Sequence, residues 1–257
     1  MLTVGELFDG DDAAARGELS REGIPRDLKY VGLTDVNARE LMRMARLNEG
    51  SSFGQTVQAC LYQKPVEPSD SLREIVCLTN IRRILSFNYD DILETAFEVV
   101  GRKYDRLVAG DEIPFHSDTT LVFHPHGYLP RGANSSRRPL SIVLSEDDYH
   151  RLYSSPYSWA NLVQITLLLT YCVLFIGCSF RDPNLRRLLD LVKEMRPQQR
   201  HYALLKTPPA LKTDDRHSAL AELPKVVQDT DMRERRIIPL WWSDESELVA
   251  LLRQVAS

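Results

Sequence analysis

Apolar and polar positions along the chain alternate in a way that predicts strands and helices in turn. Residues 83–87 form a short apolar run, and helical spacing follows from Asp90 to about Val100. Residues 120–123 form a second apolar run. Because strands that lead into helices build a mostly parallel sheet, this half of the chain predicts an α/β fold.

The second half of the chain continues the same pattern. Helices are predicted from Ser145 and over 157–169, and the run 172–176 has the composition of a buried strand. Asp182 and Pro183 then occupy the positions of a helix cap and a first helical residue. The remaining expected features are an apolar helix face at Leu185, Leu188, Leu189 and Val192, strands at 201–205 and 237–242, and a last helix through Leu248, Leu251 and Leu252.

The first eighty residues differ from the rest of the chain. Their apolar positions have the spacing of helices, separated by loops, and none of them forms a strong strand pattern. Residues 36–47 have the pattern of a surface helix, and Ser69 or Ser71 can cap a second helix. We therefore expect a helical small lobe over residues 1–80 and a Rossmann-like core over residues 81–257.

Two stretches of the core have the composition of loops. The segment 207–236 contains three prolines and many charges, and we interpret it as a surface insertion. The segment 130–139 is rich in Gly, Ser, Asn and Arg, which makes it a candidate flap.

Composition and charge narrow the class of protein. With 257 residues, 43% hydrophobic and 26% charged, the chain can bury a sizeable core. Its net charge of -4 provides no general attraction for nucleic acid or anionic lipid, so neither is an expected partner. The longest apolar run, 162–176, is interrupted by polar residues and is shorter than the roughly 20 residues of a membrane span. Without a visible secretory signal, the expected location is the cytoplasm.

The four cysteines, Cys60, Cys77, Cys172 and Cys178, are widely spaced and include no C-x-x-C pair. This spacing predicts neither a zinc site nor a redox dithiol. We expect reduced, mostly buried thiols and no bound metal.

Small polar residues follow two of the predicted strands. Asn88 and Asp90 come after the run that ends at Phe87, and His126 and Gly127 come after the second run. Ligands of α/β proteins bind at the carboxyl ends of parallel strands, so the expected ligand is a nucleotide. The same residues have structural explanations, because an Asn or Asp caps helices and His126 can be an ordinary loop residue.

A third strand end carries Gly177 and Ser179. A glycine removes a side chain from the site, and the helix N-terminus that follows can face a phosphate. Both residues can equally serve only as a turn between strand and helix.

The order of these motifs resembles the sirtuin-like family. The resemblance rests on Asn88-Tyr89-Asp90, on His126-Gly127 and on the stretch from Phe175 to Asn184. Further matching stretches are 144–149, 157–159 and 201–205. The likeness covers residue 40 to the C-terminus and is greatest to the bacterial branch whose members hydrolyse NAD in antiphage defence.

The resemblance implies an NAD glycohydrolase with Asn88 and His126 as the catalytic pair. The residues that it implies for binding the nucleotide are Asp90, Gly127, Gly177 and Ser179. NAD would be the substrate, and no metal would take part. The implied partners are NAD or an ADP-ribose-like nucleotide, and either a second copy of the chain or another protein of a defence system.

Two departures from the family pattern affect the expected function. The family's Gly-Ala-Gly-x-Ser phosphate loop has its nearest match in residues 17–25, where Glu18 and Leu19 replace small residues. A carboxylate there would repel a pyrophosphate, so this N-terminal part is degenerate or missing, and an inactive nucleotide sensor or interaction module stays open as a second function. The paired C-x-x-C motifs of deacylating sirtuins are absent as well, which argues against lysine deacylation.

Overall fold

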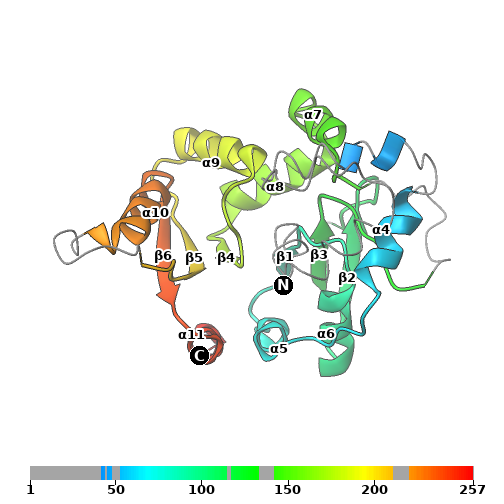
Figure 1. The fold of residues 1–257 in the computed structure, drawn as a ribbon, viewed down its shortest axis with the longest axis horizontal. Helices are drawn as coiled ribbons and strands as arrows, with labels where there is room; N and C mark the ends of the chain where they lie inside the picture. Colours follow the sequence, from blue (N-terminus) through cyan, green and yellow to red (C-terminus); the bar gives the residue numbers. More distant parts are fainter. Residues whose placement is uncertain are drawn as a thin grey trace, which may run out of the picture. The chain divides into compact units, whose positions relative to one another are not determined.

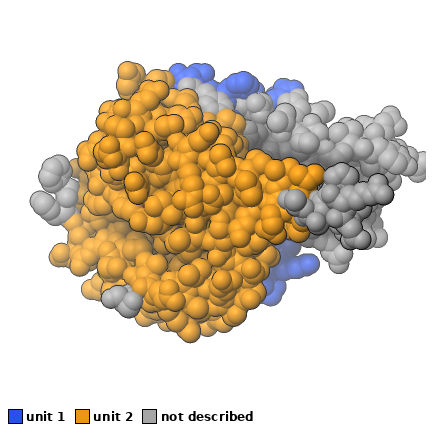
Figure 2. Space-filling model, turned by 90° about the vertical axis from the view of Figure 1, so that its left-hand side faces the viewer, with its two compact units in different colours: residues 1–65, 86–91, 126–155 blue, residues 66–85, 92–125, 156–257 orange. Residues whose placement is uncertain are grey.

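The structure is a computed structural model that describes residues 42–43, 45–47, 53–114, 117–132, 142–210 and 220–256 (Figure 1). These residues fall into two compact units (Figure 2). Unit 1 contains the described residues up to Pro65, residues 86–91 and residues 126–155. Unit 2 contains residues 66–85, 92–125 and those from Pro156 onward.

The first sheet of unit 2 has three parallel strands in the order β1-β3-β2. Their bounds are β1 Arg83–Leu85, β2 Tyr104–Val108 and β3 Thr120–His124, and α6 (Ile92–Val100) connects β1 to β2. Side chains of β3 alternate between the two faces. Val122 packs on the α6 side with Ala96 and Phe97, whereas Leu121 and Phe123 pack on α8 (Trp159–Thr170) through Val163.

The second sheet of unit 2 also has three parallel strands, in the order β4-β5-β6. The elements that build and cover it are α5 Asp70–Cys77, β4 Leu174–Ile176, α9 Pro183–Met195, β5 His201–Lys206, α10 Leu223–Glu234, β6 Ile237–Trp242 and α11 Glu245–Ala256. Helix α9 covers one face with Leu188 and Leu189, and α11 covers the other with Leu248 and Leu252.

Two helices contribute to the cores of both sheets in unit 2. On α5, Val76 packs with the first sheet and Ile75 with the second. On α8, Val163 packs with the first sheet and Leu168 with the second. Helices therefore flank both parallel sheets, which confirms the Rossmann-like α/β fold class expected from the sequence.

Unit 1 has a separate core of its own. Its elements are α4 (Phe53–Leu61) and α7 (Glu146–Ser154), and residues 42–43 and 45–47 are also helical. The buried side chains of this core are Phe53, Tyr89, Leu129, Ile142 and Leu144. Tyr89 and Leu129 thus place the segments that follow β1 and β3 in the same core as α4.

Most of the predicted elements are present, and three helix caps form as expected. Ser69 accepts from the Leu72 amide at the start of α5, and Asp182 accepts from the Leu185 amide at the start of α9. Ser145 forms a reciprocal capping box with Asp148 at the start of α7.

The structure corrects the predictions at several places. Helix α6 begins at Ile92 rather than Asp90, and β2 and α10 were not predicted as elements. Strand β2 was missed because Asp105 and Arg106 are exposed on an edge strand. Helix α10 lies within the segment interpreted as an insertion and begins with a proline near its first position, where proline is tolerated.

The expectation of mostly buried thiols is wrong. Cys60, Cys77 and Cys172 are exposed and Cys178 is half-buried, although all four are free thiols as expected. Cys178 packs against the core of the second sheet. Within the described part of the chain, no helix is long and apolar enough to cross a membrane.

Some expectations fall on parts of the chain outside the described residues. The phosphate-loop match at 17–25 and most of the candidate flap at 130–139 belong to this group. The boundary expected between residues 80 and 81 stays a prediction.

Candidate functional site

Asn88 and His126 follow two neighbouring strands at equivalent positions. In the parallel pairing of β1 with β3, Leu85 lies opposite Phe123. Asn88 is the third residue after Leu85, and His126 is the third residue after Phe123. The register thus brings the two segments out at the same edge of one sheet, as the sequence predicted.

Unit 1 joins these two segments directly. The Leu129 amide donates a 2.6 Å hydrogen bond to the Tyr89 carbonyl, and the Phe87 ring lies 4.9 Å from the His126 ring between centroids. The turn around Asn88 is held locally by its own amide, which donates to Ser86 Oγ at 3.3 Å. Two predicted catalytic residues are therefore carried on segments that contact each other.

The surroundings of His126 are mostly aromatic. Only 6% of the residue is exposed, and the Tyr149 ring meets the His126 ring edge-on at a centroid distance of 5.7 Å. Gly127, the next residue, is buried and has a φ of 98°. A side chain would be strained at that φ, so glycine is required for the turn that follows the histidine.

A hydrogen-bonded path also connects Tyr89 with the backbone of His126. The Tyr89 hydroxyl donates to the Val143 carbonyl at 2.5 Å, and the Val143 amide donates to the His126 carbonyl at 2.8 Å. Segment 142–144 thus forms a bridge between the residue after Asn88 and His126 itself.

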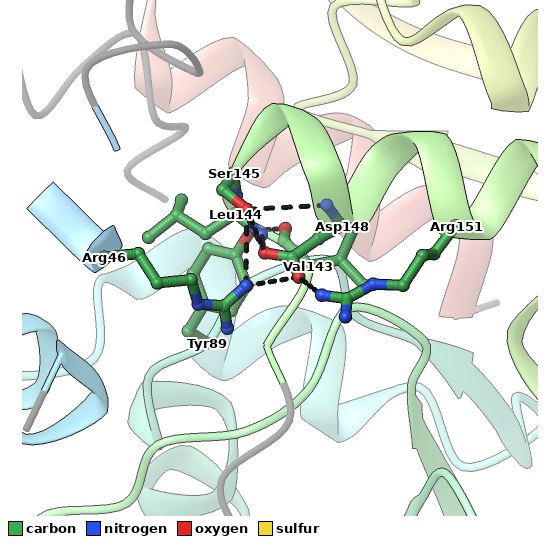
Figure 3. Close-up of polar contacts among 7 residues, drawn as sticks. All are labelled: Arg46, Tyr89, Val143, Leu144, Ser145, Asp148 and Arg151. Atoms are coloured by element: carbon green, nitrogen blue, oxygen red, sulfur yellow. Dashed lines mark hydrogen bonds and ion pairs between the residues drawn. The ribbon is translucent and has the colours of Figure 1, made fainter. Parts of the chain in front are cut away.

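Asp148 anchors this bridge at the start of α7. Its carboxylate accepts from the Ser145 amide and hydroxyl, from the Leu144 amide, and from the guanidinium groups of Arg46 and Arg151 (Figure 3). Burial opposes ionisation here, but the hydrogen bonds from Arg46 and Ser145 outweigh burial and lower the pKa of Asp148 below its ordinary value. The carboxylate is therefore charged at neutral pH.

A second polar group, which we call the Tyr62 clasp, holds the same two segments from the side of α4. The clasp consists of Tyr62, Asp91, Leu129 and Arg131. The Asp91 amide donates to the Tyr62 hydroxyl at 2.9 Å, and that hydroxyl donates to the Leu129 carbonyl at 2.6 Å. The Arg131 amide donates to the Asp91 carboxylate at 2.7 Å, and the two side chains form an ion pair at 3.0 Å.

Asp90 lies beside this clasp and is 8% exposed. Burial raises the pKa of Tyr62 far above its ordinary range, and the negative charges of Asp91 and Asp90 raise it further. The charge of Asp90 thus acts on the hydroxyl that holds the Asn88 segment.

Gly177 and Ser179 form the turn between β4 and α9 in unit 2. Both are exposed, and Gly177 has a φ of 63°. Phe180 shares the left-handed backbone region with a φ of 56°, which its burial against the Phe175 ring at 5.0 Å offsets. The thiol between the two site candidates, Cys178, has its pKa raised to about 11 by burial, so it is protonated at neutral pH.

The N-terminus of α9 offers few donors for a phosphate. The Asp182 carboxylate already accepts from the Leu185 amide at 2.9 Å, and Pro183 has no amide hydrogen. The exposed groups of this turn are therefore Gly177 and Ser179 rather than the end of the helix.

The predicted site residues are divided between the two units. Asn88, Asp90, His126 and Gly127 lie in unit 1, where hydrogen bonds join their segments, and Gly177 and Ser179 lie in unit 2. A groove of about 530 Å³ between α9 and α10 is lined by none of them; it contains Arg186, Leu223, Pro224, Val227, Gln228 and Asp231. Among the described residues, no three His, Cys, Asp or Glu side chains gather as metal ligands.

Sequence reasoning missed the Tyr62 clasp and the bridge from Val143. Tyr62 follows a helix end and shows no motif, so no local signal could have identified it. No local pattern indicates the role of Asp91, because its carboxylate reaches Arg131 forty residues further along the chain.

The two parallel sheets and their flanking helices define a Rossmann-like α/β protein. The SIR2-like domain matches residues 82–224 of the chain, which is more than half of its 257 residues. The chain therefore belongs to the SIR2-like domain family.

Three characterised relatives resemble the chain over parts of their length. The NAD(+) hydrolase ThsA of Enterococcus faecium is 29% identical over 189 residues, which is 68% of this chain and 37% of that protein. The NAD(+) hydrolase ThsA of Bacillus cereus strain MSX-D12 is 27% identical over 191 residues, which is again 68% of this chain and 37% of that protein. The defense-associated sirtuin 2 of Bacillus subtilis is 23% identical over 135 residues, 52% of this chain and 13% of that protein. The chain thus spans well under half the length of each relative.

Proposed function

We propose that this chain hydrolyses NAD to nicotinamide and ADP-ribose, with Asn88 and His126 as the catalytic pair. The observation that carries the proposal is the pairing of Leu85 with Phe123, which brings both residues out of neighbouring strands onto segments in hydrogen-bonded contact. Membership of the SIR2-like family and similarity to two proteins named NAD(+) hydrolases support the same reaction.

The chemistry of this reaction suits a site without paired carboxylic acids. Nicotinamide leaves as a neutral molecule from a cationic ring, so the leaving group needs no protonation. The bond between the ribose C1′ and the nicotinamide nitrogen breaks, and its electron pair passes to the ring. Water then forms a bond to C1′ and loses a proton. What the protein must supply is a held sugar, an oriented water and a proton acceptor.

Asn88 and His126 can supply the last two requirements. An amide side chain can orient a water molecule through both its carbonyl and its amino group. A histidine, with an ordinary pKa of about 6.5, can accept the proton of that water near neutral pH. The aromatic surroundings of His126 would keep other water away from the developing oxocarbenium ion.

The other predicted residues have binding roles in this proposal. Asp90 supports the Asn88 segment, and Gly127 lets the backbone after His126 approach the ligand. Gly177 and Ser179, on the turn after β4, are the residues of unit 2 that we propose for nucleotide binding. No step of the reaction requires a metal.

The experiment is a measurement of nicotinamide release from NAD by the purified chain, using chromatography. We expect Asn88→Ala and His126→Ala each to lower the rate by at least about a hundredfold. Asn80→Ala and His150→Ala are matched controls, because both residues are exposed, and their rates should equal that of the wild type. Unchanged rates in both catalytic variants would rule out the assigned pair.

A second candidate function is nucleotide binding without turnover. The sequence favours it at one point, because Glu18 and Leu19 replace small residues in the nearest match to the family's phosphate loop. Calorimetric titration with NAD and with ADP-ribose separates the functions. Binding without nicotinamide release would identify a nucleotide sensor, and no binding would leave an interaction module.

The biological setting that we propose is bacterial antiphage defence, with a second copy of the chain or another defence protein as partner. The name of the Bacillus subtilis relative supports this setting. Expression of the chain in a phage-sensitive host, beside the His126→Ala variant, tests it. Equal plaque numbers for both would contradict a defence role that depends on NAD hydrolysis.

A further inference from the structure

We infer that the Tyr62 clasp is a positioning device that fixes the segment of Asn88 against the segment of His126. The inference rests on the proposed function, since it assigns Tyr62, Asp91 and Arg131 a part in the same reaction. We assign these three residues no contact with the substrate. They act by holding the backbone on which the catalytic pair is carried.

The hydroxyl of Tyr62 is the centre of the clasp. It accepts from the Asp91 amide at 2.9 Å and donates to the Leu129 carbonyl at 2.6 Å. Asp91 is the third residue after Asn88, and Leu129 is the third residue after His126. One oxygen atom therefore joins equivalent positions of the two catalytic segments.

The proton of Tyr62 is fully committed to this role. A phenol has a single O–H hydrogen, and here it is donated to Leu129. Burial and the nearby carboxylates raise the pKa of Tyr62, so the group stays a neutral donor at working pH. Tyr62 is thus a positioning residue rather than an acid or base of the reaction.

Asp91 and Arg131 close the clasp from the other side. The Asp91 carboxylate accepts from the Arg131 amide and pairs with the Arg131 guanidinium, which also lies 5.3 Å from the centre of the Tyr62 ring. Arg131 thus contacts both the Tyr62 ring and the Asp91 carboxylate, and the Tyr62 hydroxyl contacts the Asp91 backbone. Such closed groups hold one arrangement better than separate pairs do.

Helix α4 gives the clasp a fixed base. Tyr62 is the residue after α4, Phe53 of α4 is buried in the core of unit 1, and the Gln58 side chain donates to the Pro130 carbonyl. The helical part of unit 1 therefore holds the His126 segment through two of its side chains. A change in α4 should be transmitted to the catalytic pair.

The kinetic experiment compares Tyr62→Phe with Tyr104→Phe in the full chain. Both changes remove one hydroxyl, but that of Tyr104 donates to the exposed Glu98 carboxylate at 3.4 Å, its one hydrogen bond to a described residue. We expect Tyr62→Phe to lower kcat for nicotinamide release at least about tenfold, with KM within about twofold of wild type, because positioning is lost while binding is kept. Tyr104→Phe should leave both constants unchanged.

A second measurement records hydrogen exchange of the backbone amides of Asp91, Leu129 and Arg131. Tyr62→Phe should speed their exchange, whereas Tyr104→Phe should not. If Tyr62→Phe fails to fold, Arg131→Lys serves instead. It keeps the charge, loses the planar guanidinium and should lower kcat in the same direction.

The outcomes separate the inference from the proposed function. A wild-type chain that releases no nicotinamide overturns both. An active wild type whose Tyr62→Phe variant matches Tyr104→Phe in kcat and in exchange overturns the clasp alone. A fall in both kcat and KM would also contradict it, because that pattern indicates a changed ground state rather than lost positioning.

Discussion

The Glu94 carboxylate lies 2.8 Å from Nε2 of His124, and both side chains are buried, with exposed fractions of 3% and 0%. Glu94 lies in the first turn of α6, and His124 is the last residue of β3. The pair therefore connects the helix that follows the Asn88 segment with the strand that precedes His126. Among the described residues, none donates a hydrogen bond to the second oxygen of Glu94, so the pair is only partly satisfied.

Removing one member of this pair should be strongly destabilising. Glu94→Leu leaves the His124 ring buried without its carboxylate, and we expect a loss of about 3 to 5 kcal/mol in the free energy of unfolding. The double variant Glu94→Leu with His124→Phe should recover most of that loss, because the interior is then apolar. Urea unfolding of the four proteins of this cycle measures both values. A double variant less stable than Glu94→Leu would contradict the account.

The Tyr89 hydroxyl supports a second prediction. In Tyr89→Phe the Val143 carbonyl loses its 2.5 Å hydrogen bond, which should lower the free energy of unfolding by about 1 to 3 kcal/mol. Because the Val143 amide donates to the His126 carbonyl, nicotinamide release should fall as well. Tyr171→Phe is the control, since its ring is exposed. Equal stability of the two variants in urea would show that the Tyr89 bond contributes nothing.

The lowered pKa of Asp148 predicts how stability depends on acid. The folded chain holds this carboxyl charged more strongly than the unfolded chain, so its contribution is complete above the ordinary pKa of 3.8 and is lost as the pH falls below it. At neutral pH, Asp148→Asn should lose about 1 to 2 kcal/mol from the cap and the arginine contacts. As the pH falls below 3.8, the gap between the variant and the wild type should narrow.

A neighbouring residue provides the control for Asp148. Asp147 lies on the same first turn of α7 but is exposed, so Asp147→Asn should leave the free energy of unfolding unchanged at both pH values. Thermal unfolding followed by circular dichroism is a sufficient measurement. A gap between Asp148→Asn and the wild type that is as large at about pH 3 as at neutral pH would contradict the assignment.

The sequence could predict those features of the fold that a run of apolar residues marks locally. Asn88 and His126 follow apolar runs, and parallel strands end at a common edge, so a position at one edge of a sheet could be expected for both residues before the structure was known. Strand β2 could not be expected in this way. Its middle residues Asp105 and Arg106 face solvent at the sheet edge, so the apolar pattern of a strand is interrupted.

Contacts between distant segments were also beyond local patterns. Tyr62 and Leu129 are separated by 67 positions, and the hydroxyl bond between them depends on how α4 packs in unit 1. The cysteines illustrate the opposite error. Their apolar chemistry suggested burial, but Cys60 and Cys77 lie on exposed parts of α4 and α5.

His201 carries the last prediction, which concerns mild acid. It is the first residue of β5, is 2% exposed, and its Nδ1 accepts from the Val173 amide at 3.2 Å, so the neutral ring carries its hydrogen on Nε2. Burial lowers the pKa of His201 below 6.5, and the unfolded chain therefore binds the proton more readily. The stability that this residue contributes is complete above pH 6.5 and is lost as the pH falls toward the folded pKa.

We expect the wild type to lose up to about 1.4 kcal/mol per pH unit in that window through His201, and His201→Gln to lose less. Urea midpoints at about pH 7.5 and about pH 5.5 measure the difference, because an ordinary histidine titrates between them. His150→Gln, at an exposed position, should keep the slope of the wild type. If His201→Gln kept that slope too, the buried ring would not be the group that titrates.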